Sequence, residues 1–413
     1  MTTLLFREDA YRRTAPACLC GLTPEGGIIL DQCLFYPTGG GQPGDSGTLE
    51  WEGGRIAIAT AVKGEAGSVV LVPAEPSALP PVGAELIQQI DWTRRYAHMR
   101  VHTALHLLSV VIPLPVTGGQ IGEGRGRLDF DMPHAPGDVT ALEDRLNDLV
   151  DRDLAVTEDW ISDAELMANP GLVKTMSVAP PMGQGRVRLV RIGAGTDQID
   201  LQPCGGTHVA ATGDIALFKI IGESAVSSGV RRIEALTGEA ARLWLVERDQ
   251  ILRDVAAAFR TSPEDVPARV SALVEERKRL ERELAEARKA LAMGGGSDND
   301  AAGTEDIGGV AFTGKVADGL DPKDLRGLVD EAKARLGEGV ACVISVNDGR
   351  ASVAVGVTPG LVARFNAGDL VRAAVGALGG QGGGGRPDMA QGGGPDGANA
   401  AQALAAIRLL IAG

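Results

Sequence analysis

The pattern of hydrophobic and polar positions changes period several times along the 413-residue chain. Within residues 1–90, short alternating runs such as GGIILDQCLFYP, TLEW, RIAIATAV and SVVLVPA lie between Gly and Pro turns, which predicts strands. From Asp91, the run DWTRRYAHMRVHTALHLLSVVI has no Gly or Pro and carries apolar residues at helical spacing until Pro113. We therefore expect a β-rich segment followed by a long helix.

Residues 114–240 return to mixed patterns. A glycine-rich turn and a strand at GRLDFDM come first, and DVTALEDRLNDLVDRD follows as an acidic helix with Leu142, Leu146 and Leu149 on one face. Two further strands are expected at GRVRLVRI and DIALFKIIG.

The longest helical pattern covers residues 240–292. Pro263 and Pro267 interrupt it, which predicts two helices joined by a turn. Apolar residues of the second helix repeat at spacings of 4 and 3, with Arg277 breaking the seam, at Val266, Val270, Leu273, Leu280, Leu284, Ala287 and Leu291. Two interpretations stay open, a coiled-coil or hairpin arm and an amphipathic helix packed on its own domain.

The remaining residues begin with GGGSDNDAAG at 294–303, a flexible linker by composition. Strands are expected at GVAFTGKV, ACVISVND and ASVAVGVT, helices at DPKDLRGLVDEAKARL and AGDLVRAAVGAL, and then a glycine-rich loop and a final helix. The predicted fold class is α+β. Its regions are a β-rich subdomain at 1–90, an α+β domain at 91–240, a helical or coiled arm at 241–293 and a glycine-rich α/β domain at 301–413.

Composition limits the class of protein. With 44% hydrophobic residues, the chain can form a sizeable core. No apolar run approaches the roughly 18 residues of a membrane span, and the first residues do not resemble a signal peptide. Five cysteines are too few for a disulfide framework in a chain of this length. We expect a cytoplasmic protein with no membrane partner.

The formal net charge of −14 argues at first against a nucleic-acid partner. Its distribution weakens that argument, because residues 129–165 alone hold 12 acidic and 2 basic residues. The rest of residues 1–240 is nearly neutral, and so are 241–300 and 301–413. A polyanion can therefore contact other parts of the surface, although one dominant basic patch is not expected.

Histidines and one cysteine form the chemically most specific pattern. The chain has five histidines, and His98, His102 and His106 follow one another at four-residue steps on one helix face. The motif Cys204-Gly-Gly-Thr-His208 adds a thiolate and a further imidazole. Two imidazoles, a thiolate and a third imidazole suit tetrahedral Zn²⁺. The alternative is a core helix whose ring nitrogens bond the backbone.

The neighbours of these histidines limit the chemistry of a metal. Thr103 follows His102 where an HExxH metalloprotease has its glutamate, which argues against a protease. Four protein ligands leave no free position for water unless one is displaced, so a structural or substrate-positioning metal stays open beside a catalytic one. Neither glycine-rich loop, FYPTGGGQPGDSG nor GGQGGGGRPDMAQGGG, has the lysine and serine of a P-loop.

Three motifs, in order, resemble the editing domain of alanyl-tRNA synthetase, namely FYPTGGGQPGDSG, RVHTALHLL and CGGTHVAATGDIALFKI. The final GGGGRPDMAQGGG resembles the C-terminal domain of that synthetase, whose relatives also occur on DHH-type phosphoesterases, although the chain has no DHH triplet. Because the editing-like region starts at residue 1, we expect no class II aminoacylation domain. The chain is therefore similar to a long-form, free-standing AlaX-type trans-editing protein.

The resemblance implies an ATP-independent, zinc-dependent hydrolase that supports translation fidelity. It would deacylate mischarged tRNA(Ala), chiefly Ser-tRNA(Ala) and in some members Gly-tRNA(Ala). The alternative is a tRNA-binding adaptor without deacylase activity. His102, His106, Cys204 and His208 match the family's zinc ligands one for one.

Further residues receive expected roles from the same resemblance. Thr117 would discriminate serine, and Gln42 with Gly39, Gly40 and Gly41 matches the glycine motif near the substrate pocket. In the C-terminal domain, which contacts the tRNA in the synthetase, the candidates are Arg386, Gly383, Gly384 and Gly385. Homodimerisation is expected through 266–291 and the C-terminal domain. The sequence identifies no catalytic, water-activating residue.

Overall fold

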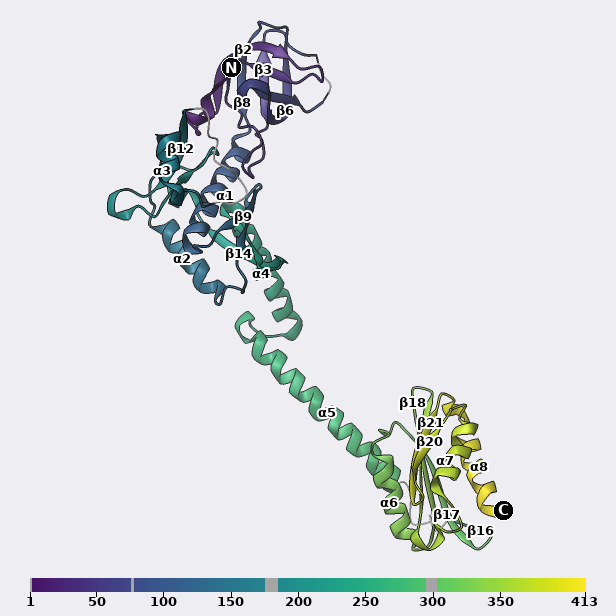
Figure 1. The fold of residues 1–413 in the computed structure, drawn as a ribbon. Coiled ribbons are helices and arrows are strands. Elements are labelled where there is room, and N and C mark those ends of the chain that lie inside the picture. The colour runs from purple at the N-terminus through teal and green to yellow at the C-terminus, as the bar shows by residue number, and fades with distance from the viewer. Residues whose placement is uncertain (1, 76–77, 175–184, 295–302) are drawn as a thin grey trace. The chain divides into compact units, whose positions relative to one another are not determined.

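The computed structural model describes residues 2–75, 78–174, 185–294 and 303–413, with the side chains of 289 and 291–294 excepted (Figure 1). The chain divides into two compact units, Met1–Asp254 and Val255–Gly413. Most of the linker expected at 294–303 lies outside the described residues. The described helices include none that is long and apolar enough to cross a membrane. Several sheets and helices confirm the predicted mixture of α and β structure.

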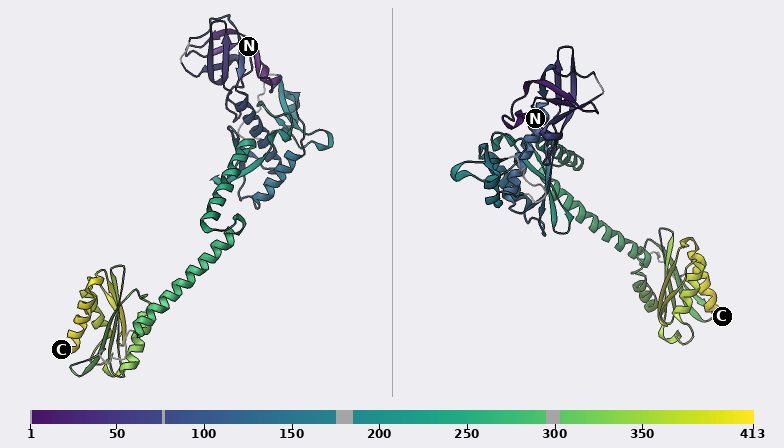
Figure 2. Two further views of the ribbon diagram at one scale, coloured as in Figure 1. Left: turned by 180° about the vertical axis from the view of Figure 1, so that it is seen from behind. Right: turned by 45° about the horizontal axis from the view of Figure 1, so that its top comes forward.

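The first unit begins with a closed β-barrel, seen from two further sides in Figure 2. In barrel order its strands are β2 (Thr14–Leu22), β3 (Ile28–Leu30), β7 (Val69–Pro73), β6 (Gly54–Lys63), β5 (Gly47–Trp51) and β8 (Glu85–Ile90). Strict alternation of exposed and buried residues along β8 turns Leu86, Gln88 and Ile90 inward. A short parallel pair, β1 (Thr3–Leu4) and β4 (Gln32–Cys33), flanks the barrel. The period-2 pattern therefore produces the expected β-rich start.

The expected long helix is α1 (Trp92–Val111), whose N-cap residue Asp91 accepts a hydrogen bond from the Arg94 amide. An antiparallel sheet packs against it in the order β14 (Phe218–Ser227), β15 (Val230–Thr237), β10 (Arg125–Asp131) and β9 (Val116–Ile121). The acidic helix is α2 (Val139–Asp151), and it buries Leu146. A second sheet holds β11 (Val156–Ser162), β12 (Arg186–Ile192) and β13 (Asp200–Pro203), with α3 (Asp163–Ala168) beside it.

Two local predictions are corrected in this unit. The segment VTGGQI, expected as a turn, is strand β9, because β10 supplies its antiparallel hydrogen-bonding partner. The strand expected at DIALFKIIG begins only at Phe218, after a 3₁₀ turn over Thr212–Ile215.

A fully buried ion pair connects the barrel side of this unit to α1. The Arg95 guanidinium on α1 donates to both carboxylate oxygens of Asp45, and also to the carbonyls of Ala10 and Leu34 at 2.9 and 2.6 Å. Because four acceptor oxygens satisfy the cation, its burial is compensated. Residues 37–44, called the glycine loop below, precede Asp45 and are thereby fixed relative to helix α1, the helix that carries His102 and His106.

Two helices follow, α4 (Gly238–Phe259) and α5 (Val266–Gly294). The turn falls at Pro263 as expected, but Pro267 lies inside the first turn of α5, where its missing N–H has no helical acceptor. On α5, Leu280 and Leu284 are 50% and 51% exposed. At these two positions the apolar seam is not buried against a domain of the same chain.

The C-terminal sheet of the second unit has helices on both faces. Its order is β16 (Thr304–Ile307), β17 (Val310–Asp318), β18 (Gly339–Asn347), β19 (Arg350–Val357), β21 (Met389–Gly394) and β20 (Gly383–Arg386). Helices α7 (Ala367–Ala377) and α8 (Ala400–Ala412) cover one face, and α6 (Leu325–Leu336) covers the other (Figure 1). Alternate residues of β18, such as Cys342 and Val343, face the two cores.

The glycine-rich segment after Leu378 is a β-hairpin, which corrects the expected loop. Glycine suits these strands because α7 lies directly against them. A Cβ added at Gly383 would lie 2.7 Å from Val371 Cγ1, and one at Gly392 would lie 2.5 Å from Val375 Cγ2. The absence of side chains, which suggested a loop, is here a packing requirement.

Candidate metal centre and pocket

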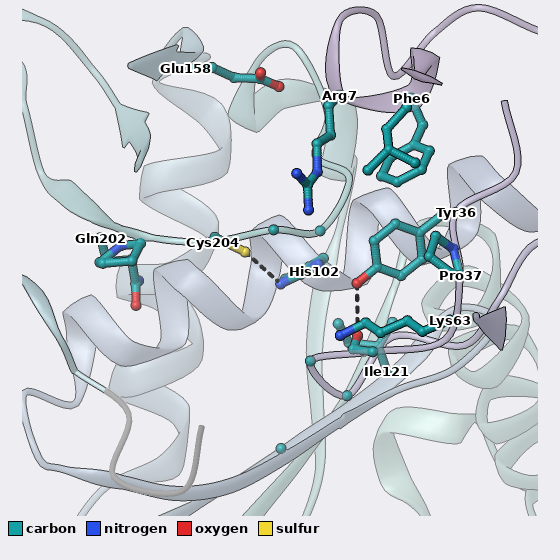
Figure 3. A pocket seen from close by; sticks show the side chains of 18 of the residues that line it. Phe6, Arg7, Tyr36, Pro37, Lys63, His102, Ile121, Glu158, Gln202 and Cys204 are labelled. Carbon is teal, nitrogen blue, oxygen red and sulfur yellow. Dashed lines mark hydrogen bonds between the residues drawn. The ribbon is translucent and has the colours of Figure 1, made fainter. Parts of the chain in front are cut away.

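A large pocket lies in the first unit, between the glycine loop, strand β9, the β13 end and helix α1 (Figure 3). Its volume is about 1540 Å³. A typical small-molecule site has about 300–1,000 Å³, so this pocket can hold a larger ligand. His102, His106 and Cys204 line part of its wall.

Four side chains converge at this wall. His102 and His106 come from successive turns of α1, whereas Cys204 and His208 come from the loop after β13. One ligand atom from each lies within 4.8 Å of the others. Cys204 Sγ is 3.3 Å from His102 Nε2 and 3.2 Å from His208 Nε2. The structure thus brings together the predicted His/His/Cys/His set, and this set could hold a metal ion.

The loop that carries Cys204 depends on a glycine and an arginine. A Cβ added at Gly206 would lie 2.1 Å from His102 Cε1, so only glycine lets the loop approach the ring. Arg188 on β12 is 5% exposed and donates from Nη1 to the carbonyls of Cys204 and Gly206 at 2.9 and 2.8 Å. These contacts fix the loop against the histidine helix.

Each of the three histidines has an oxygen partner at Nδ1. His102 Nδ1 lies 2.9 Å from Gln42 Oε1, His106 Nδ1 lies 2.9 Å from Asp200 Oδ2, and His208 Nδ1 lies 3.1 Å from Thr103 Oγ1. In the tautomers whose Nδ1–H donates to these oxygens, the Nε2 lone pairs are available to a metal. Partners of this kind orient metal-ligating imidazoles and raise their basicity. The donor set and its surroundings therefore fit a bound cation.

Charges around the cluster favour the thiolate. Burial opposes ionisation of Cys204, but His102 and His208 outweigh it and hold the pKa of the thiol well below its ordinary value. Burial and the nearby His102 lower the pKa of His208 to about 3, which keeps this ring neutral. Burial also acts against the charged form of Asp200, yet its bonds to His106 and Lys174 lower the pKa of the carboxyl to about 2. The ionised carboxylate of Asp200 thus bonds the imidazole of His106, a candidate metal ligand.

The predicted substrate residues occupy three different places. Thr117 and Gly39 to Gly41 line the pocket, and Thr117 Oγ1 donates to the Asp129 carbonyl at 3.1 Å. Gln42 is 1% exposed and lies behind His102, where it also donates to Thr207 Oγ1 at 2.8 Å. Arg386 and Gly383 to Gly385 form β20, the edge strand of the C-terminal sheet, in the second unit.

Sequence reasoning missed Thr103, Arg188 and Asp200. Asp200 lies 94 residues from its partner His106, and nothing in the sequence separates it from the other acidic residues. Thr103 offered a weak indication, since it sits between two predicted ligands and its Oγ1 also accepts from the Val209 amide at 3.2 Å. Only the fold brings these partners to the ligands.

Three family models match segments of the chain, and two of them are described as tRNA synthetase families. Residues 187–234 match the threonyl and alanyl tRNA synthetase second additional domain. Residues 21–94 match the tRNA synthetases class II (A) family, although no class II aminoacylation domain was expected, and residues 309–413 match the DHHA1 domain.

Whole-chain relatives agree with these matches. The chain is 50% identical over 406 residues to the alanine–tRNA ligase of Rhizorhabdus wittichii, covering 93% of the chain and 44% of the relative. It is 45% identical over 410 residues to the alanine–tRNA ligase of Sphingopyxis alaskensis, covering 93% and 45%. The C-Ala domain of Aquifex aeolicus alanyl-tRNA synthetase is 28% identical with a TM-score of 0.26, covering 27% of the chain and 98% of that domain.

The chain therefore carries alanyl-tRNA synthetase-like domains and is a homologue of alanine–tRNA ligases. It spans a little under half the length of the curated relatives that it matches.

Proposed function

We propose that the chain is a trans-editing protein of the AlaX type, and that its pocket hydrolyses the ester of mischarged tRNA(Ala), chiefly Ser-tRNA(Ala) and also Gly-tRNA(Ala). The observation that carries this proposal is the His102, His106, Cys204 and His208 cluster at the wall of a pocket of about 1540 Å³. The match of residues 187–234 to the second additional domain of threonyl and alanyl tRNA synthetases supports it.

Zn²⁺ is the proposed metal, because imidazole and thiolate donors together suit it. His102, His106, Cys204 and His208 would hold the ion, which would supply positive charge at the pocket wall and link the Cys204 loop to helix α1. Gln42, Asp200 and Thr103 keep the imidazoles oriented. No water-activating residue is assigned.

An aminoacyl ester is already activated, so the pocket mainly has to position the ester and a water molecule. Thr117 is proposed to select serine. Its hydroxyl proton goes to the Asp129 carbonyl, which leaves Oγ1 lone pairs to accept from the serine hydroxyl. Alanine and glycine would both leave this acceptor unpaired, so Thr117 accounts for the preference for serine and not for the order of glycine and alanine.

The proposed partner is tRNA(Ala), on the basis of the similarity to alanine–tRNA ligases. Contacts by Arg386 and Gly383 to Gly385 with the tRNA belong to the proposal. So do a second copy of the chain bound along 266–291 and the C-terminal domain, and a cytoplasmic location. The proposal concerns the hydrolytic site alone and not the ligation reaction of the relatives.

Deacylation of Ser-, Gly- and Ala-tRNA(Ala), measured side by side, tests the proposal. The expected order of rates is serine first, then glycine, with alanine near the uncatalysed rate. His106→Ala should lose both zinc and activity. Retention of tRNA without deacylation at any protein concentration would favour the adaptor alternative, and full activity of metal-free His106→Ala would refute the metal assignment.

A further inference from the structure

Three basic side chains of the pocket have no carboxylate partner. Arg7, Lys63 and Arg186 line the pocket, and none of them forms an ion pair with any residue that the structure describes. The other lining cation, Lys174, bonds Asp200 at 2.5 Å. Of the two carboxylates on the wall, Glu158 pairs with Arg188, and Glu8 is exposed. The uncompensated charge of this wall is therefore positive, in a chain of net charge −14.

Among the three cations, Arg7 has the strongest need for an anionic partner. Its Nε is buried and has no hydrogen-bond partner in the described structure, and its guanidinium points into the pocket (Figure 3). The preceding residue, Phe6, is 2% exposed and packs edge-to-face on Tyr36 with 5.4 Å between ring centroids. Burial and the cations Arg188 and Arg186 lower the pKa of Arg7. A rigidly placed, desolvated cation beside like charges is stabilised by an anion.

Lys63 and Arg186 reach the same pocket from other elements. Lys63 ends strand β6, and its Cε lies 2.9 Å from the position of a Cβ on Gly39, so the side chain crosses the glycine loop. Arg186 begins strand β12, and its guanidinium lies 4.5 Å from the ring centroid of Trp160, which is 40% exposed. Three distant segments thus bring three cations and an accessible aromatic ring to one cavity.

We propose that Arg7, Lys63 and Arg186 bind backbone phosphates of a single-stranded RNA 3′ end, with Trp160 as a stacking surface for one base. This inference rests on the proposed function, because that 3′ end would carry the ester. Several cations from separate elements suit an extended polyanion rather than one small acid, and the pocket exceeds the usual small-molecule volume of about 300–1,000 Å³. Cations combined with an exposed aromatic ring are the usual means of holding single-stranded nucleic acid.

The test compares two RNA hairpins with the same stem, one with a single-stranded 3′ end and one blunt, in fluorescence-anisotropy titrations with the full chain. Wild type should bind the 3′-extended hairpin more tightly than the blunt one. Arg7→Gln should weaken binding of the extended hairpin by about tenfold, the value of one charge-assisted contact. Its log–log salt slope should fall by about 0.7, the share of one phosphate in a single strand. Blunt-hairpin binding should be unchanged.

Further variants test whether the loss of binding is specific to the pocket cations. Lys63→Gln and Arg186→Gln should act in the same direction as Arg7→Gln. Arg55→Gln removes an exposed arginine of β6 outside the pocket and should leave both hairpins unaffected. Metal content and the melting temperature of each variant exclude a folding defect as the cause.

The outcomes separate this inference from the proposed function. If wild type deacylates Ser-tRNA(Ala) while Arg7→Gln, Lys63→Gln and Arg186→Gln all keep wild-type KM and hairpin affinity, the phosphate site is wrong and the function stands. If no aminoacyl-tRNA is hydrolysed but the 3′ extension still strengthens binding through these three residues, the phosphate site stands and the function is wrong. Equal affinity of wild type for both hairpins would also overturn the site.

Discussion

At the scale of single residues, the candidate metal cluster is defined as much by the oxygen partners of the imidazoles as by the four candidate ligands. Gln42 and Thr103 offer neutral oxygens to His102 and His208, whereas Asp200 offers a carboxylate to His106. Asp200 is 2% exposed and also bonds Lys174. Because a carboxylate raises the basicity of the ring that it holds, Asp200 should contribute most among the three partners.

Asp200→Asn should therefore weaken zinc binding by about 10- to 100-fold, the usual effect of losing such a partner. The asparagine keeps an acceptor oxygen but loses the negative charge. Competition with a chromophoric chelator measures the affinity. Asp197→Asn is the matched control, since Asp197 ends the 3₁₀ turn Gly195–Asp197 just before β13 and its side chain is 70% exposed. Equal zinc affinity for Asp200→Asn and wild type would show that the carboxylate does not support the metal.

His98 is a histidine of the same helix that takes no part in the cluster. It is 1% exposed, and neither ring nitrogen has a hydrogen-bond partner among the described residues. Burial, with a contribution from Arg94, lowers the pKa of His98 from 6.5 to about 4. Above pH 6.5 the ring is neutral in both folded and unfolded chains. Between pH 6.5 and 4, only the unfolded chain takes up the proton, so stability is lost as the pH falls.

The expected loss from His98 is about 3 kcal/mol of unfolding free energy between pH 7 and pH 4. His98→Leu should remove this part of the pH dependence, which denaturant unfolding at a series of pH values measures. His134→Leu, at an exposed position, should keep the wild-type dependence. An unaltered pH profile for His98→Leu would contradict the assignment of a neutral buried ring.

At the scale of elements, periodicity predicted helices better than glycine-rich strands. Helix α1 falls within a residue of the expected range at both ends, because Asp91 caps it and Pro113 follows it. The segment VTGGQI and the C-terminal glycine runs were expected as a turn and a loop, since glycine alone gives no alternation of burial. Their strand structure comes from neighbours distant in sequence, which one segment cannot reveal.

In the candidate site, too, some residues could be predicted from the sequence and others only from the fold. The four metal-ligand candidates were identifiable because residue type and spacing define them, whereas Arg7 could not be found by spacing. It contributes to the pocket only because the N-terminal segment returns to the glycine loop through Phe6 and Tyr36.

The glycine hairpin of the second unit allows a test at this scale. Gly392→Ala should destabilise this unit by about 1–3 kcal/mol, because its Cβ would overlap Val375 in the α7 interface. Gly384→Ala is the matched control on the neighbouring strand, since a Cβ there meets no atom within 4 Å. Urea unfolding followed by circular dichroism measures both. A larger loss for Gly384→Ala than for Gly392→Ala would mean that the packing of α7 on β21 is not as described.

At the scale of the whole molecule, the exposed seam of α5 is expected to bind a second copy of the chain. Leu280 and Leu284 form an apolar groove with Leu273, and the flanking Glu276, Arg277 and Glu281 offer charges of both signs. Heptad seams of this kind associate through apolar residues and select partners through flanking charges. Leu280→Lys with Leu284→Lys should convert a dimer into a monomer in light scattering. An unchanged mass per particle, or a monomeric wild type, would refute this assembly.

The net charge of the chain and its distribution predict how strongly salt affects tRNA binding. The net charge of −14 includes −10 within residues 129–165, much of it on the exposed side of α2 and its flanking loops. No large basic field is therefore available, and the proposed phosphate contacts are those of Arg7, Lys63 and Arg186 in the pocket and of Arg386 in the second unit. The three pocket contacts to a single strand contribute a log–log slope of about −2 and Arg386 adds about −1, against about −10 for a repressor that covers duplex DNA. Titration of wild type with uncharged tRNA(Ala) at several salt concentrations measures the slope, and a value near that of such a repressor would require an extensive phosphate interface elsewhere on the chain.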